Sequence, residues 1–352
     1  MKKTIVIFYS IVLLASSCSK KSDSTDSIIS VPNAIAANIG FATQNGGTSG
    51  GDAAKVVTAT SYIELKNYLE SPINNYIVKV EGRIYNGTSG GSIKVRSNKT
   101  LLGTTANAFL DGVGLTIDGY SNIVIRNIKI SMVSITNRTD PAVYSPTGDE
   151  GRPQILVNGG DAIRINNASN IWIDHCEFFN EDPSVQTNQD LYDGLVDIGG
   201  SSAFITVSWN YFHDHHKVHL VGSSDTDDFD RKTTFAYNYY KKVEQRLPSY
   251  RFGNGHVFNN YYNNISGSAI NSRMGACLKV ENNVFETANS PLITSGPPSG
   301  KYELSNNSYT GITGVAAPST STCTLTIPYT YNLKANTDVK AFVIAGAGVG
   351  KL

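Results

Sequence analysis

A short strand pattern that contains a polar residue recurs along this 352-residue chain and restricts its fold more than any other feature. Its copies are NIVIRNIKI, NIWIDHCEF, FITVSWNYF, TTFAYNYY, GHVFNNYY, CLKVENNVF and YELSNNSY, and their aligned polar residues are Asn127, His175, Asn210, Asn238, Asn260, Asn283 and Asn307. The last four of these residues are 22 to 24 apart, the first gap of 48 is a double step, and insertions lengthen the next two gaps. A period of this length indicates a repeat that stacks on itself.

Each repeat consists of a strand, a turn and a second strand, which is too small to bury its apolar face alone. Val, Ile, Tyr and Phe alternate with polar residues and helix-length periodicity is missing, so helical solenoids are excluded. We predict an all-β fold, a parallel β-helix, in which asparagine amides at one turn hydrogen-bond to their copies in adjacent coils. A β-sandwich or a propeller is the alternative, although a propeller blade needs a longer period.

One segment has clear helical amphipathicity, and it is SYIELKNYLES at residues 61–71. Its apolar face is imperfect and consists of Ile63, Leu65, Tyr68 and Leu69. We expect this short helix to cap the β-helix near its N-terminus, where the first coil would otherwise expose apolar side chains.

The N-terminus has the features of an export signal. A basic start precedes an apolar run from Ile5 to Ala15 and small residues before Cys18, a pattern that resembles a bacterial lipobox. We predict a signal peptide at 1–17, a tether at 18–37 and one parallel β-helix domain at 38–352. The protein is then secreted across the inner membrane and held at the cell envelope by a lipid on Cys18. An ordinary signal peptide without lipidation is the alternative.

The composition suits an extracellular β-rich protein, because charged residues make up only 16% of the chain and the formal net charge is +0. Nothing in it indicates nucleic-acid binding, and we expect a monomer.

The cysteines beyond the leader are an odd number without a C-x-x-C pair, so neither a disulfide framework nor a zinc site is expected. We interpret Cys176 and Cys277 as buried free thiols, and one disulfide among Cys176, Cys277 and Cys323 stays open.

Three aspartates stand beside glycines in the irregular region of the repeat. They are Asp161 in NGGDAIRI and Asp193 and Asp197 in DLYDGLVDIGG. On a straight strand Asp193 and Asp197 would be roughly 13 Å apart, but a bend at Gly194 would bring the carboxylates together. Asp197 should face outward and its two neighbours the core. Oxygen ligands alone favour Ca²⁺ over Mg²⁺, and a purely structural Asp-Gly corner is the alternative.

Insertions in a repeat fold map to loops on one face, often the binding face. We therefore expect long loops at about 133–158, 180–192 and 213–232, with a groove beside them. The segment FHDHHKVHLVGSSD should turn Lys217 and His219 toward this groove, and its histidines match no zinc motif and are expected to make hydrogen bonds between coils.

Two further basic residues, Arg246 and Arg251, lie close together in EQRLPSYR. The planar guanidinium group suits carboxylates and phosphates. Solvated surface charge is the alternative role for this pair.

Taken together, NIWIDHCEF, DGLVDI, ITVSWNYF, KVHLVGSSD, QRLPSYR and AGAGVGKL resemble the pectate lyases of polysaccharide lyase family 1, and GFATQNGGTSGG resembles their N-terminal segment. The resemblance covers about residues 40 to 352. It implies a right-handed parallel β-helix and calcium-dependent cleavage of de-esterified pectin (polygalacturonate) by β-elimination. It also implies calcium binding by Asp161, Asp193 and Asp197, substrate binding by Lys217 and Arg251, abstraction of the C5 proton by Arg246, and structural support from Asp174 and His175.

Two positions depart from the pattern of that family. Many members carry a further aspartate where this chain has Gly159, and some carry glutamate in place of Asp193. Either weaker calcium binding or an ion that arrives largely with substrate is therefore expected. An arginine base is also chemically unusual, since a guanidinium group stays protonated unless burial and like charges disfavour the cation.

Three alternative functions stay open. They are a pectin lyase for methyl esters, a polygalacturonase-like hydrolase and a non-catalytic glycan-binding β-helix lipoprotein.

Overall fold

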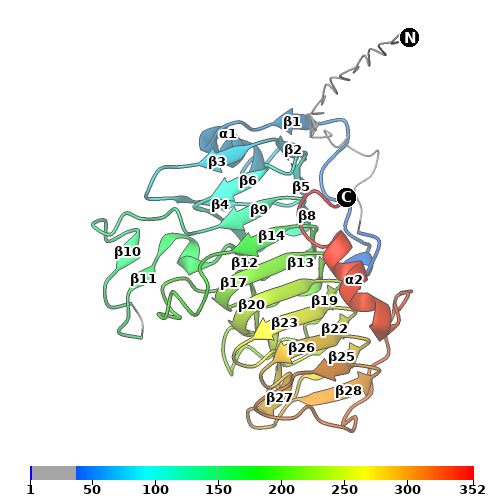
Figure 1. Cartoon of the computed structure of the whole chain (residues 1–352). Helices are drawn as coiled ribbons and strands as arrows, with labels where there is room; N and C mark the ends of the chain where they lie inside the picture. The colour runs from blue at the N-terminus through cyan, green and yellow to red at the C-terminus, as the bar shows by residue number, and fades with distance from the viewer. Residues whose placement is uncertain (2–36, 149) are drawn as a thin grey trace.

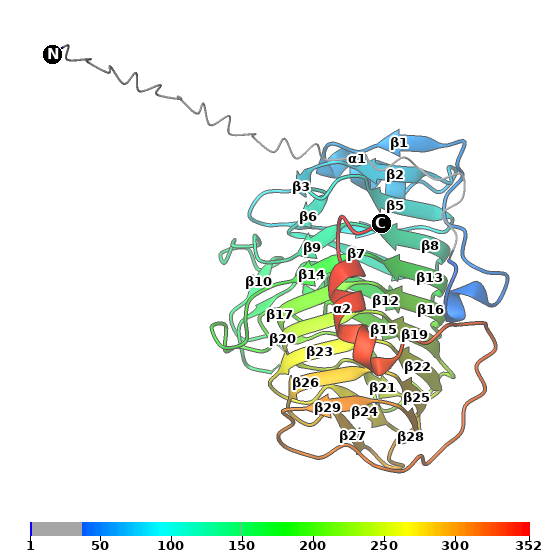
Figure 2. The ribbon, with the colours of Figure 1, turned by 45° about the vertical axis from the view of Figure 1, so that its right-hand side comes forward.

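The structure is a computed structural model that describes residues 1, 37–148 and 150–352. The described chain is a stack of coils whose strands form three long parallel sheets, as Figures 1 and 2 show. Neighbouring coils cover the apolar face that a single coil leaves open. The predicted all-β parallel β-helix is confirmed.

The three sheets run the length of the stack. Sheet A contains β1 (Val56–Thr58), β2 (Ile77–Val80), β5 (Lys99–Gly103), β8 (Ser121–Arg126), β13 (Ser169–Asp174), β16 (Ala203–Ser208), β19 (Lys232–Ala236), β22 (Asn254–Phe258), β25 (Cys277–Glu281) and β28 (Lys301–Ser305). Sheet B contains β3 (Arg83–Tyr85), β6 (Phe109–Asp111), β9 (Lys129–Ser131), β14 (Glu177–Phe179), β17 (Tyr211–Lys217), β20 (Tyr239–Gln245), β23 (Tyr261–Ile265), β26 (Val284–Ala288) and β29 (Ser308–Thr310). Sheet C contains β4 (Gly91–Lys94), β7 (Val113–Asp118), β12 (Ile163–Asn166), β15 (Val196–Gly199), β18 (Leu220–Val221), β21 (Ser249–Arg251), β24 (Ile270–Arg273) and β27 (Leu292–Ser295). Outside these sheets lie the hairpin β10 (Tyr144–Ser145) and β11 (Gln154–Ile155) and the 3₁₀ turns η1 (Phe41–Thr43) and η2 (Val157–Gly160).

Like side chains stack on one another inside the coils. The inner face of sheet B carries an aromatic stack with ring centroids 4.4 to 5.2 Å apart, formed by Phe178, Phe212, Tyr240, Tyr262 and Phe285. Parallel register produces this stacking, because each coil places a given position about 4.8 Å from its copy in the next coil. On sheet C the two neighbours of Asp197 are buried and Asp197 faces outward, as predicted.

An asparagine ladder follows the turn between sheets A and B. The Nδ2 atoms of Asn210, Asn238, Asn260 and Asn283 each donate to the Oδ1 atom of the next asparagine, and the ladder ends at Asn307. The donor–acceptor distances are 3.0 to 3.1 Å. These bonds confirm the predicted stacking of amides for the five residues.

The sequence alignment is wrong by one residue at its first two members, Asn127 and His175. Cys176 is the residue that occupies the ladder position before Asn210, and its backbone N–H donates to the Asn210 Oδ1 atom over 2.8 Å. The His175 ring instead stacks on Trp209. The error arises because polar residues occupy two consecutive places of this turn, as the NN pairs of the later repeats show.

Helix α1 (Tyr62–Leu69) lies at the N-terminal end of the stack, as predicted, and the Ser61 side chain caps it (Figure 1). Leu65 and Leu69 are fully buried. Ile63 is 61% exposed, so its predicted place on the apolar face is wrong.

A second helix, α2 (Asn336–Gly346), has no counterpart in the sequence prediction. It lies along the outside of the stack (Figure 2), where Val339 and Val343 are buried and Phe342 meets Trp209 edge-on. Its apolar residues run almost continuously, which hides a helical period in the sequence.

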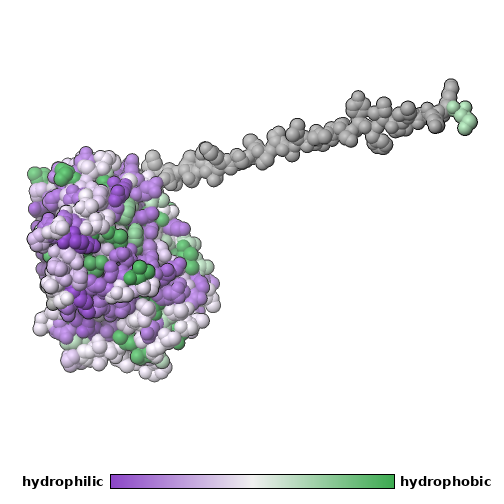
Figure 3. Space-filling view, turned by 60° about the vertical axis from the view of Figure 1, so that its left-hand side comes forward, coloured by the Kyte–Doolittle hydropathy of each residue, from purple (hydrophilic) through white to green (hydrophobic). Residues whose placement is uncertain are grey.

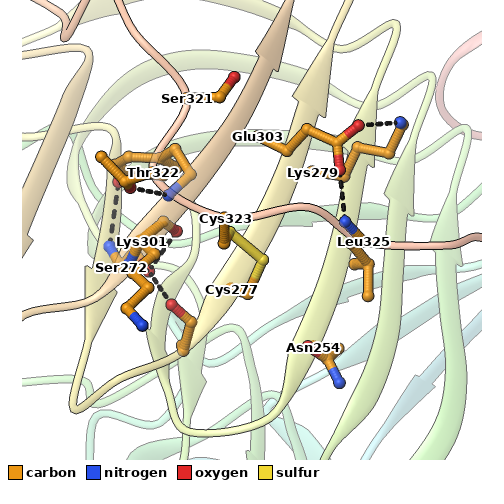
Figure 4. Close-up of a disulfide and its surroundings, with 12 residues drawn as sticks. Asn254, Ser272, Cys277, Lys279, Lys301, Glu303, Ser321, Thr322, Cys323 and Leu325 are labelled. Atoms are coloured by element: carbon orange, nitrogen blue, oxygen red, sulfur yellow. Dashed lines mark hydrogen bonds and ion pairs between the residues drawn. A yellow bond between two sulfur atoms is a disulfide. The ribbon is translucent and has the colours of Figure 1, made fainter.

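Cys277 and Cys323 form a disulfide, whereas Cys176 is free and buried. The interpretation of Cys176 as a free thiol is therefore confirmed and that of Cys277 is wrong. Figure 4 shows how the bond ties the segment after β29 to strand β25. The Thr322 N–H of the same segment donates to the Tyr302 carbonyl over 2.7 Å. Because these cysteines are far apart in sequence, only the fold reveals that they meet.

Within the described part of the chain, none of the helices has the length and apolarity needed to cross a membrane. The face in Figure 3 is mainly hydrophilic, with apolar residues in small separate groups. The predicted signal peptide and Cys18 lie outside the described residues, except for Met1, and so does the tether up to residue 36.

Candidate functional site

Two of the predicted loop segments lie against each other beside sheet C. Arg152 in segment 133–158 forms an ion pair with Asp190 in segment 180–192, and the Asn188 side chain donates to the Pro153 carbonyl over 2.7 Å. The third segment is shorter than predicted, because β17 and β18 occupy most of its first half and only residues 222–231 form a loop. A cavity of about 510 Å³ opens over the outer face of sheet C, bordered by the first and third segments.

Asp161, Asp193 and Asp197 converge at the floor of this cavity, where one carboxylate oxygen of each lies within 4.8 Å of the others. The predicted bend at Gly194 is present, since strand β15 begins only at Val196. A Cβ atom on Gly194 would lie 2.2 Å from Asp197 Oδ1, so only glycine leaves room for this approach. The Gly194 N–H also donates to Asp161 Oδ1 over 2.7 Å.

The three carboxylates repel one another. Burial raises the pKa of Asp161 well above its usual range, and the neighbouring Asp197 and Asp193 raise it further. Burial and repulsion from Asp193 likewise raise the pKa of Asp197 to about 7. A cation among these oxygens would remove the repulsion, and an all-oxygen donor set fits a hard ion such as Ca²⁺. Among the residues described, no second group of acidic, histidine or cysteine side chains converges in this way.

Lys217 lies at the edge of this carboxylate cluster and is only 6% exposed. Its Nζ atom is 2.9 Å from Asp193 and 3.0 Å from Asp190. Asp190, which also pairs with Arg152, is a site residue that the sequence interpretation misses. The predicted substrate-binding role of Lys217 stays a prediction, and its charge already has two protein partners.

The histidines of this region make hydrogen bonds between segments, as expected. Burial lowers the pKa of His215 to about 3, so the ring is neutral and its Nε2 atom donates to the Asp193 carbonyl over 2.8 Å. His219 is fully buried and contacts Tyr240, so its predicted place beside Lys217 is wrong. The chain turns between β17 and β18, which ends the alternation on which that prediction depends.

Arginines line the other side of the carboxylate cluster. Arg246 stands just after β20 with a φ of 64°. Its positive charge acts on Asp197 and opposes the rise in the pKa of that carboxyl group, so the two side chains are near neighbours. Arg251 on β21 donates from Nε to Asp225 over 2.7 Å. Its neighbour in the sheet register is Arg273, whose pKa is lowered by burial and by the Arg251 charge.

The sequence interpretation misses Arg273. It stands 22 residues after Arg251, which equals the shortest spacing of the repeat, so this spacing is the signal that could have found it. Asp174 and His175 lie at the end of sheet A instead. There the buried Asp174 carboxylate accepts hydrogen bonds from Arg126 and Ser208, and no contact joins the pair to the described residues of the carboxylate cluster.

Comparisons with known proteins agree with this geometry. The pectate lyase family model matches residues 23–352. A pectate trisaccharide-lyase of Bacillus licheniformis is 40% identical over 321 residues, which cover 89% of this chain and 86% of that protein. Pectate lyase A of Aspergillus niger is 34% identical, with coverage of 89% and 87%.

Solved structures agree as well. A pectate lyase from Bacillus sp. N165 in complex with trigalacturonate is 30% identical, with a TM-score of 0.76 and coverage of 90% of this chain and 99% of that one. Pectate lyase C of Erwinia chrysanthemi at pH 9.5 with 30 mM Ca²⁺ is 26% identical, with a TM-score of 0.69 and coverage of 91% and 97%. The family match, the curated relatives and the shared fold lead to one conclusion: this chain belongs to the pectate lyase family.

Proposed function

We propose that this protein cleaves polygalacturonate by Ca²⁺-dependent β-elimination. The observation that carries the proposal is the convergence of Asp161, Asp193 and Asp197 within 4.8 Å beside the Arg246 guanidinium group. The relative solved with trigalacturonate and the relative solved with Ca²⁺ support the polymer and the ion, respectively.

Elimination from a uronate unit removes the proton at C5, next to the C6 carboxylate, and expels the oxygen at C4. When bound, Ca²⁺ withdraws charge from that carboxylate and acidifies the C5 proton. Asp161, Asp193 and Asp197 would hold the ion. The product carries a double bond between C4 and C5.

Arg246 is the proposed base for the C5 proton. Its guanidinium group forms neither a hydrogen bond nor an ion pair with a described residue, so it is available to substrate. Arg273 and Arg251 supply positive charge on this side of the site. Arg251 and Lys217 are the proposed partners of substrate carboxylates, which a guanidinium group can bind through two parallel hydrogen bonds.

Product absorbance tests the reaction. Polygalacturonate and highly methylated pectin are each incubated with the protein, with and without a chelator, and the ultraviolet absorbance of the conjugated unsaturated product is followed. We expect product only from polygalacturonate and only without chelator. Chelator-resistant activity confined to the methyl ester would establish a pectin lyase, reducing ends without absorbance a hydrolase, and neither signal a binding protein.

Two arginine variants test the base. Arg246→Lys and Arg246→Ala should both lose nearly all turnover while polymer binding persists, because the other charges of the site remain. Arg251→Ala should mainly raise KM, since it removes a contact present in both ground and transition states. Near-normal turnover of Arg246→Lys, with the fold verified by circular dichroism, would reduce Arg246 to an electrostatic stabiliser.

We further propose that Cys18 is lipidated and holds a monomeric enzyme at the cell envelope. The support is the sequence pattern of the leader, since Cys18 lies outside the described residues. A fatty-acid probe should label the wild type, and equal labelling of Cys18→Ala would refute the anchor. Light scattering of the soluble domain should give the mass of one chain.

A further inference from the structure

Arg164 on strand β12 has no role in the reaction described above. It is exposed, and its guanidinium group makes no hydrogen bond or ion pair within the described ranges, in contrast to Arg251. In the register of sheet C, Arg164 stands directly beside Asp197, and it lines the same cavity of about 510 Å³. The strand order places it on the side of the carboxylate cluster opposite to Arg251 and Arg273.

A glycine keeps the space next to Arg164 open. Gly159 has a φ of +70°, and a Cβ atom there would lie 3.1 Å from Arg164 Nη1 and 3.9 Å from Asp161 Oδ2. The space above the Gly159 backbone is therefore bordered by the guanidinium group on one side and by the carboxylate cluster on the other. Asn158 fixes this turn in place, because its Oδ1 atom accepts hydrogen bonds from two hydroxyl groups and its Nδ2 atom donates to the Asp161 carbonyl.

The strands of sheet C beyond Arg164 carry few exposed charges. Strands β12, β7 and β4 carry Arg164, Asp118 and Lys94 as their exposed charged residues. The Asp118 carboxylate already accepts hydrogen bonds from the side chains of Asn166 and Asn167. Lys94 is two strands away from Arg164. A polyanion that crosses sheet C from the carboxylate cluster would thus meet Arg164 as the first available cation of the described surface.

We propose that Arg164 binds the carboxylate of the uronate unit adjacent to the one held at the carboxylate cluster, on the side of strands β7 and β4. The inference rests on the proposed cleavage of polygalacturonate and adds a specificity-determining position to it. A polyuronate carries a carboxylate on every unit, and the guanidinium fork binds a carboxylate through two hydrogen bonds. A methyl ester has no such charge, so Arg164 favours de-esterified polymer at this unit.

Steady-state kinetics of Arg164→Ala and Arg164→Lys test the proposal, with Lys301→Ala as the control. Lys301 is an exposed lysine on sheet A, so this variant removes one positive charge from a different face. We expect the KM for polygalacturonate to rise about tenfold in Arg164→Ala, with kcat within about twofold of the wild type, and to recover partly in Arg164→Lys. On partially methylated pectin the difference in KM should shrink, and Lys301→Ala should match the wild type on both substrates.

Calorimetry supplies a readout that is independent of turnover. Trigalacturonate is titrated at saturating Ca²⁺ into Arg246→Ala with and without Arg164→Ala, and Ca²⁺ alone is titrated into the wild type and Arg164→Ala. We expect trigalacturonate to bind about tenfold more weakly without Arg164, while the affinity for Ca²⁺ stays equal or rises slightly because a like charge is removed.

Unchanged KM and unchanged trigalacturonate affinity would overturn the proposal. A change in Ca²⁺ affinity alone would show that Arg164 only neutralises the carboxylate cluster, and it would overturn the proposal equally. If the wild type forms no unsaturated product, the proposed cleavage fails, and the trigalacturonate titration then decides the role of Arg164 by itself.

Discussion

The asparagine ladder and the carboxylate cluster both bring polar side chains of successive coils together, yet their electrostatics are opposite. Each inner amide of the ladder donates to the next asparagine and accepts from the previous one, so its polar atoms are matched. The carboxylates of Asp161, Asp193 and Asp197 can only accept when ionised, and their repulsion contributes to raising the pKa of Asp197 to about 7. The ladder is complete by itself, whereas the cluster keeps a repulsion that the nearby Lys217 and Arg246 do not remove.

The two regions also differ in how the chain builds them. The ladder requires only regular register, because the same place in each coil receives the same residue. The cluster forms where the repeat is interrupted: Asp161 follows turn η2, Asp193 precedes β15, and Gly194 provides the space between them. Regular register therefore builds the ladder, and interruption of the repeat builds the carboxylate cluster.

The largest expected effect comes from breaking the cluster. Asp197→Asn removes one ionised ligand but keeps an oxygen that can accept the hydrogen bond from the Leu220 N–H. We expect turnover of polygalacturonate to fall by roughly 10³-fold, because the metal stabilises the developing charge by several kcal/mol. Initial rates across a calcium titration measure this loss. Asp228→Asn, a change in an exposed loop residue, is the control, and a small loss in Asp197→Asn would contradict the proposed ion site.

Breaking the ladder should affect stability instead. Asn260→Ala removes the acceptor of the Asn238 amide and the donor to Asn283, and it leaves buried polar atoms unmatched. We expect the free energy of unfolding to fall by about 3 kcal/mol, with turnover per folded molecule unchanged. Urea unfolding measures the first quantity and initial rates the second.

The control for the ladder is Asn263→Ala, a half-buried position on the outer face of sheet B. A change there should cost less than about 0.5 kcal/mol. Equal destabilisation by the two variants would mean that the ladder hydrogen bonds add nothing to stability.

The same comparison explains what the sequence could predict. Period and residue type indicate the β-helix and the five stacked asparagines, because stacking copies one position into every coil. The carboxylates are also predictable, because glycine beside aspartate marks the bend that brings Asp193 and Asp197 together.

The errors arise where contacts join residues without a shared position in the repeat. Cys277 meets Cys323 through a segment that leaves the coil, and the continuous apolar run of α2 carries no clear helical period. His219 changes sides because the chain turns after Lys217. Arg273 is the exception, since the repeat spacing from Arg251 would have located it.

A smaller expected effect is a mutation that stabilises the fold, whereas most mutations lower the free energy of unfolding. In chelator, Asp197→Asn should raise the free energy of unfolding by about 1 kcal/mol, because it relieves repulsion with Asp193 and Asp161. With saturating Ca²⁺ the wild type should be the more stable protein, since it binds the ion more tightly. Urea unfolding in both conditions measures the crossover, and Asp228→Asn should show none.

The smallest effect concerns a contact that, unlike the ladder, requires a charge. His216 faces two acceptors, the Glu244 carboxylate and the Gln186 carbonyl of segment 180–192, and Lys217 is the adjacent cation. Burial alone would lower the pKa of His216, but these two hydrogen bonds outweigh it and raise the pKa. The imidazolium can donate to both acceptors, whereas the neutral ring has a single N–H.

Because the pKa of His216 is raised in the folded protein, the stabilisation is fully present below about pH 6.5 and is lost as pH rises through the folded pKa. We expect opening of segment 180–192 to become easier by up to about 1 kcal/mol toward pH 9, measured by hydrogen exchange corrected for its intrinsic pH dependence. Peptides of the asparagine ladder should show no such trend, because amides do not titrate. His216→Gln, which has no titrating group, should abolish the trend in segment 180–192; persistence of the trend in this variant would show that His216 does not cause it.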